Sequence, residues 1–245
     1  GALDALDQVV ALDSARADST FYTKYLVTAT AAQQPDKARI IKAASRALAK
    51  YPENASLIKQ AVGAYAQIGA SDSLLPGLER LIKVDSAAAV GFALTQADTL
   101  QKQNLGAQAD PYIKFVVAHG DQQAKDGVAG LAFQRAAKLL QPPPQWIPAA
   151  DSLRMVRQIL SPTSRLAPLV NYYSSLALVN VIVAKDQEAE KGKSCDAARA
   201  VEALEGEAEG TLAAAEAYIK SPQGQTNEKT YGSLKSYVAG LKPRT

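Results

Sequence analysis

The feature that most constrains the fold is a motif that recurs after about 34 residues in the first half of the chain. Each copy places its residues at helical spacing on two consecutive segments. The first copy comprises Ile58, Ala61, Tyr65 and Gly69, then Leu78, Leu81 and Ile82; the second comprises Phe92, Thr95, Thr99 and Gln103, then Tyr112, Phe115 and Val116. A period of roughly 20–50 residues is typical of stacked units that cannot bury their apolar faces alone. The sequence therefore predicts an array of helix pairs.

The composition also favours helices. Alanine is the most frequent residue, whereas only 6% of the residues are aromatic. Alanine is the best helix former and lets helices approach closely. Alternating β-branched runs between tight-turn dipeptides are missing, which argues against strands. We therefore expect an all-α fold.

Capping residues and breakers predict where the helices lie. A helix is expected after a cap at Asp18, Ser19 or Thr20, and Gly69 fits the left-handed residue that ends a helix. The other expected helices cover residues 2–12, 36–50, 54–68, 73–84, 85–103, 106–118, 126–140, 146–160, 166–187, 195–220 and 227–241. We expect residues 1–140 to form the repeats. Residues 141–245 would form degenerate helix pairs and capping helices that continue the same superhelix, with a bend at Pro142–Pro144.

Charge and hydropathy bear on partners and location. The net charge is +3, and the Lys and Arg residues are scattered along the chain, so no nucleic-acid partner is expected. The longest apolar run, 176–184, is too short to span a membrane and predicts a buried helix. The chain begins with Gly1 rather than Met, so either a presequence has been removed or the sequence is a fragment. The compartment stays open: an exported bacterial protein, periplasmic or envelope-associated, or a cytoplasmic one.

No residue set predicts a reaction. His119, the single histidine, stands where a helix is expected to end, which favours an interaction with the helix dipole. Cys195 is the single cysteine, and a small packed residue is a better interpretation than a reactive thiol. Glu202, Glu205 and Glu209 share one face of an expected helix. The solvent-exposed side of an amphipathic helix is a better interpretation of this face than a cation site. We therefore expect no enzyme activity, no cofactor and no metal.

The repeated residues resemble the tetratricopeptide family, whose unit of about 34 residues is two antiparallel helices. Tyr65 stands at the family's mid-helix aromatic position and Gly69 at its interhelical turn. The segments 81–85 and 47–54 are similar to the closing segment of the family's unit. The resemblance implies an α-solenoid, a right-handed superhelix of antiparallel helix pairs. Leu74 and Val62 depart from the family, which has small residues at these two positions.

The resemblance also implies a binding groove. In tetratricopeptide proteins the first helix of each pair lines a concave surface that holds a partner peptide. By position, the groove residues here would be Lys24, Val27, Lys59, Gln60, Gly63, Gln67, Ala93, Leu94, Ala97 and Gln101. Gly63 stands where a carboxylate clamp would need Asn, so no such clamp is expected. Contacts to the partner would be apolar and hydrogen-bonded rather than ionic.

Three hypotheses of function follow. The leading one is a non-catalytic scaffold that binds a segment of a protein partner in the concave groove. The alternative is a structural subunit of a larger, cell-envelope or extracellular, assembly that packs through its convex or terminal faces. The third, least favoured, is an enzyme that uses Cys195 or the acidic helix.

Overall fold

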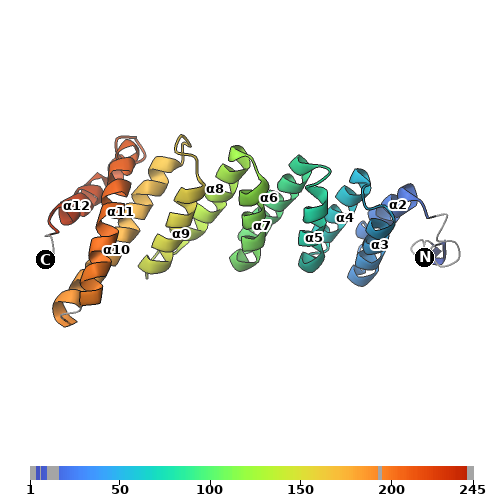
Figure 1. Cartoon of the computed structure of the whole chain (residues 1–245), viewed down its shortest axis with the longest axis horizontal. Coiled ribbons are helices and arrows are strands. Elements are labelled where there is room, and N and C mark those ends of the chain that lie inside the picture. Colours follow the sequence, from blue (N-terminus) through green and yellow to red (C-terminus); the bar gives the residue numbers. More distant parts are fainter. Residues whose placement is uncertain (1–3, 6, 10–16, 193–194, 242–245) are drawn as a thin grey trace. The chain divides into compact units, whose positions relative to one another are not determined.

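The computed structural model describes residues 4–5, 7–9, 17–192 and 195–241, and within these ranges it contains helices and no strands (Figure 1). The elements are α2 (Ser19–Thr30), α3 (Lys37–Lys50), α4 (Ala55–Gln67), α5 (Ser71–Leu81), α6 (Ser86–Lys102), α7 (Gly106–His119), α8 (Gln122–Lys138), α9 (Trp146–Ile159), α10 (Ala167–Gly192), α11 (Cys195–Ile219), η1 (Gln225–Asn227) and α12 (Glu228–Ala239). Residues 4–5 and 7–9 are helical. Leu3, Leu6 and Val10 of the helix expected at 2–12 lie outside the described residues. The all-α class is confirmed for the part of the chain described.

Side-chain caps start four of the helices, and the one at Asp18 was predicted from the sequence. The side chains of Asp18, Asp36, Asn54 and Asp85 each accept a hydrogen bond from the backbone N–H three residues further on, at 2.7–3.1 Å. Such bonds satisfy amide groups that have no partner inside the helix. Gly69 has φ of 66°, so it adopts the left-handed conformation expected between α4 and α5.

The largest differences from the expected boundaries are in α5, α8 and α10. α8 begins at Gln122 rather than at residue 126, because the Asp121 carboxylate accepts a hydrogen bond from the Ala124 amide at 2.8 Å. α5 begins at Ser71 rather than at residue 73 and ends at Leu81 rather than at residue 84. α10 continues to Gly192, five residues beyond the expected end at 187.

The chain forms two compact units, Gly1–Ala124 and Lys125–Thr245. The division falls near the start of α8, not at the expected boundary between residues 140 and 141. The buried residues of α8, among them Ala129 and Phe133, belong to the same core as residues of α9 and α10. The proline segment Pro142–Pro144 therefore lies inside the second unit, between α8 and α9.

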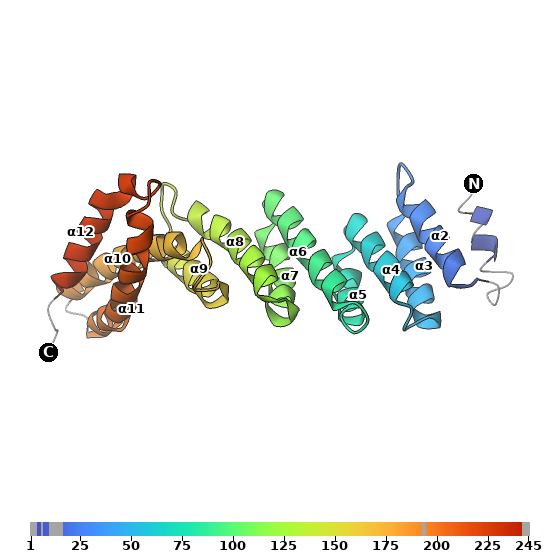
Figure 2. The same ribbon diagram turned by 90° about the horizontal axis from the view of Figure 1, so that it is seen from above.

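The first unit is built from three helix pairs, α2 with α3, α4 with α5, and α6 with α7 (Figure 2). The first helices of successive pairs also touch, because α2 contacts α4 and α4 contacts α6. Fully buried side chains such as Tyr25, Ile58 and Leu78 fill the spaces between helices. Burying each such side chain contributes about 1.5–3 kcal/mol relative to leaving it exposed.

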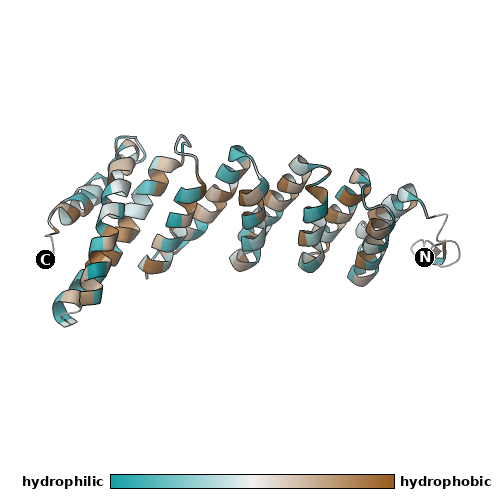
Figure 3. Cartoon of the chain, viewed as in Figure 1, coloured by the Kyte–Doolittle hydropathy of each residue, from teal (hydrophilic) through white to brown (hydrophobic). Residues whose placement is uncertain are grey.

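The second unit is organised around α10, which contacts α9, α11 and α12. By length and composition alone α10 is apolar enough to cross a membrane, but residues from its middle, including Leu178 and Ile182, lie in the unit's core. The run 176–184 thus belongs to a core helix, as predicted. Figure 3 shows hydrophobic residues recurring on each of the helices rather than collecting in one segment, as expected when every helix buries one face.

Candidate functional site

The expected groove residues of α2 are accessible. Lys24 is exposed, and the Val27 side chain is 49% exposed, which is unusual for a large apolar residue in this chain. Both project away from the buried face of α2, which carries Tyr22, Tyr25 and Leu26. An exposed valine next to a lysine can contact both apolar and polar parts of a peptide.

The expected residues of α4 join it to its neighbours. The amide of Gln67 donates to the backbone carbonyl of Thr30 at the end of α2, at 3.1 Å. Lys59 pairs with Asp85, the N-cap of α6, at 3.7 Å. Gln60 and Gly63 are half-buried. Lys59 is therefore only partly available as a cation for a ligand.

Gly63 lies beside the next first helix. A methyl group built on Gly63 would come within 3.8 Å of the Phe92 ring of α6, which is an ordinary van der Waals distance. Phe92 thus covers the small residue of α4. This contact explains why a position expected to face a peptide is half-buried.

Two expected residues of α6 are in the core, which corrects that part of the groove assignment. Ala93 and Ala97 are 0% exposed, while Leu94 and Gln101 are half-buried. The amide nitrogen of Gln101 is buried and has no hydrogen-bond partner among the described residues. Ala93 and Ala97, which are fully buried, cannot contact a partner while the helix stays in place.

The correction has a simple cause in the register of α6. Buried Ala61 of α4 corresponds to buried Ala93 of α6, and these residues are 32 positions apart rather than 34. The caps Asn54 and Asp85 are also closer than the expected period. With the corrected register, exposed Thr95 replaces Ala97 as the counterpart of Gly63. The spacing between the capping residues Asn54 and Asp85 is the sequence signal that could have revealed this shorter period.

The exposed side of α6 therefore consists of residues that the sequence reasoning missed. Gly91, Thr95 and Thr99 are exposed and follow one another at helical spacing. The hydroxyl groups of Thr95 and Thr99 donate to backbone carbonyls one turn back, at 2.9 Å. Their oxygen lone pairs remain able to accept hydrogen bonds from a ligand.

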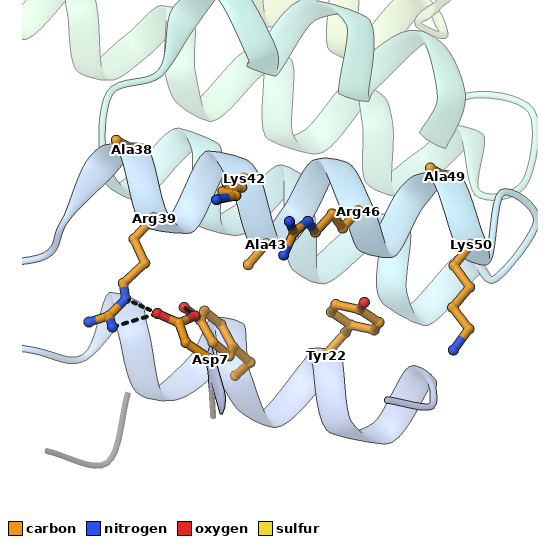
Figure 4. A pocket seen from close by; sticks show the side chains of 10 residues that line it. Asp7, Tyr22, Ala38, Arg39, Lys42, Ala43, Arg46, Ala49 and Lys50 are labelled. Atoms are coloured by element: carbon orange, nitrogen blue, oxygen red, sulfur yellow. Dashed lines mark hydrogen bonds and ion pairs between the residues drawn. The ribbon is translucent and has the colours of Figure 1, made fainter. Parts of the chain in front are cut away.

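A second candidate site lies on α3. A hollow of about 1080 Å³ is bordered by α2, α3 and Asp7. Figure 4 shows the cations following one another along α3. They are Arg39, Lys42, Arg46 and Lys50, and we call them the basic face of α3. This clustering corrects the expectation that the cations are scattered; their three- and four-residue spacing was visible in the sequence.

Carboxylates already occupy one end of the basic face. The Arg39 side chain donates from Nε to Asp7 and from Nη2 to Asp4, both at 2.6 Å. The Tyr25 hydroxyl donates to the other oxygen of Asp7 at 2.7 Å. The hydrogen bond from Tyr25, followed by the contacts from Arg39, holds the pKa of the Asp7 carboxyl below its ordinary value. Burial, with the bond to Asp7, raises the pKa of Tyr25.

The residues considered for catalysis lie on different helices. His119 is the last residue of α7 and lies against the Phe115 ring, with 4.6 Å between ring centroids. Cys195 is exposed at the first residue of α11, in the other unit. Glu202 and Glu209 are exposed, and Glu205 is half-buried, on α11. Among the described residues, no group of three His, Cys, Asp or Glu side chains could hold a metal ion.

The architecture defines the class: an all-helical protein of neighbouring helix pairs with exposed polar surfaces and a basic hollow. No family model matches the sequence, and no curated protein or solved structure matches it significantly.

Proposed function

We propose that the unit Gly1–Ala124 is a non-catalytic binding module, a tetratricopeptide-like solenoid that holds an extended or helical segment of a partner protein. The observation that carries the proposal is the direct contact of α2 with α4 and of α4 with α6. Helix pairs that repeat with their first helices in contact expose one continuous surface, which is how helical-repeat proteins present binding sites. In the proposed solenoid the pairs follow a right-handed superhelix and this surface is concave.

The proposed surface is the first-helix strip. It consists of the exposed residues Lys24, Val27, Lys59, Gln67, Thr95 and Thr99. An amide, two hydroxyls and one apolar side chain favour contacts that are apolar and hydrogen-bonded. The strip contains two cations, Lys24 and Lys59. Lys59 pairs with Asp85, whereas Lys24 has no ion-pair partner among the described residues. A single unpaired cation does not favour a carboxylate clamp, in agreement with the sequence-based expectation.

Site-specific photo-crosslinking tests this proposal. Peptides that bind the full chain would first be selected from a random library, so that no natural partner has to be known. A photoreactive residue would then replace Val27, Gln67 or Thr99 in turn, and Glu79 of α5, exposed on a second helix, as the matched control. We expect crosslinks from the three strip positions and none from the control. Crosslinks only from the α5 position would reject the first-helix strip.

One observation favours the alternative, a structural subunit that packs into a larger assembly. Ile147 and Met155 are 56% and 43% exposed and lie about two turns apart on the same side of α9. Light scattering after size exclusion separates the two functions. A stable oligomer that dissociates when both residues are replaced by Ser would favour the subunit, and a monomer would disfavour self-assembly through α9.

A further inference from the structure

We propose that the basic face of α3 is a second binding site of the first unit, and that it binds an acidic helical segment of a partner protein. This site goes beyond the proposed function, because it lies on α3 and shares no residue with the first-helix strip. The ligand class follows from three features of the hollow: the spacing of its cations, the carboxylates already bound there, and the two cations left open.

The cations are spaced for a helical ligand. Successive members of the basic face are three or four residues apart, so they lie along one side of α3 (Figure 4). Lys42 and Arg46 are four residues apart, which corresponds to about 6 Å along a helix axis. Carboxylates at positions i and i+4 of an incoming helix have the same spacing and can meet both cations.

The chain itself shows which chemical group this surface accepts. Asp4 and Asp7, which are three positions apart in the sequence, both contact Arg39, and Asp7 also accepts the hydrogen bond from Tyr25. Charge-assisted bonds from arginine to carboxylate are the stronger class of hydrogen bond. An acidic segment from another protein would repeat these contacts further along α3.

The middle of the basic face is open. Lys42 and Arg46 are exposed and border the hollow, and neither forms an ion pair with a described residue. At the far end, Lys50 donates to the Ala17 carbonyl at 2.9 Å and lies over the Tyr51 ring. Asp7 is the one carboxylate among the described residues that border the hollow. Among the described residues, the two central cations therefore have no carboxylate that neutralises them.

The walls of the hollow suit a helix rather than a fully solvated ion. Besides the cations, the hollow is bordered by Tyr22, Tyr25 and three alanines of α3. Ala38 and Ala49 are exposed and small, so they let a helix approach closely, whereas Tyr22 and Tyr25 are buried and leave little ring surface for a ligand. A helix with acidic residues on one side and alanine or leucine beside them would match both the cations and the small residues of the hollow.

Fluorescence anisotropy with the full chain tests the proposal. The probe is a labelled, alanine-rich helical peptide that carries Glu at every fourth position, and the control probe has Gln at those positions. The variant Lys42→Gln/Arg46→Gln should weaken binding of the acidic peptide by about tenfold, since two partly exposed ion pairs are lost. The variant Lys83→Gln/Lys114→Gln removes the same charge from exposed positions outside the hollow and should bind like the unmodified chain. Circular dichroism would confirm that both variants are folded.

A second variant tests whether the chain's own carboxylates occupy the site. Asp4→Asn/Asp7→Asn frees Arg39 and Tyr25 and should tighten binding of the acidic peptide by at least about threefold. Equal binding of the two probes, or unchanged affinity in Lys42→Gln/Arg46→Gln, would overturn the proposal. Tighter binding of a duplex DNA probe, with the same dependence on Lys42 and Arg46, would overturn it in favour of nucleic acid. Peptides selected for the first-helix strip should bind all these variants normally, which keeps the two sites distinguishable.

Discussion

At the scale of single residues, Glu207 joins two helices of the second unit that are distant in sequence. Its carboxylate on α11 accepts hydrogen bonds from Arg154 of α9 at 2.7–3.2 Å and pairs with Arg157 of the same helix. The Glu207 side chain is 24% exposed, so water screens these charges only in part. The bonds from Arg154 lower the pKa of Glu207, and Arg157 adds to that effect.

We predict that Glu207→Gln lowers the free energy of unfolding by about 1–2 kcal/mol at neutral pH, because a partly buried ionic contact is lost. The folded-state pKa lies below the ordinary value of 4.5, so this stabilisation is present above that pH and is lost as the pH falls through the folded pKa. Urea denaturation at several pH values measures it. The difference from the unmodified chain should shrink in acid, and Glu209→Gln at an exposed position serves as the control. A difference that does not depend on pH would contradict the assignment.

At the scale of helices, the register of α6 decides which residues can meet a partner. Ala93 is fully buried, whereas Thr95 is exposed two residues further along the same helix. We predict that Ala93→Glu destabilises the first unit by more than about 3 kcal/mol, because it buries an unpaired charge. Thr95→Glu should change stability by no more than about 0.5 kcal/mol. Thermal unfolding of the two variants measures both changes in stability. If Thr95→Glu destabilised the unit more than Ala93→Glu, the result would support the period of about 34 residues instead.

Local chemistry explains why the helices were predictable. Asp18, named as a cap from the sequence, accepts a hydrogen bond from the Phe21 amide, and Gly69 adopts a conformation that favours glycine. Such signals lie within a few residues of each other, so the sequence alone reveals them.

Contacts between distant residues were not predictable in the same way. Arg39 meets Asp7 across 32 residues, and Arg154 meets Glu207 across 53. Periodicity indicates which side of a helix is apolar but does not identify the helix that covers it. For the same reason the exposure of the predicted residues on α6 depended on a register that shifts by two residues, whereas Lys24 and Val27 of α2 and Lys59 and Gln67 of α4 are exposed.

At the scale of the whole molecule, each of the two units has its own buried core, which is the usual mark of a unit that can unfold separately. Leu57 and Leu153 are both 0% exposed, one in each unit. We predict that Leu153→Ala, which costs about 2–5 kcal/mol, raises amide hydrogen exchange in α9–α12 and leaves α2–α6 protected. Leu57→Ala should have the opposite pattern. Uniform loss of protection along the chain in both variants would show a single cooperative unit instead.

In the function that we propose, the first helices of successive pairs form one partner-binding surface. A crystal structure of the full chain with a library-selected peptide would show whether they do. We expect the peptide to cross α2, α4 and α6 and to contact Val27, Gln67 and Thr95. A peptide seated on α5 and α7, or a first unit in which α2 and α6 do not both pack against α4, would contradict it.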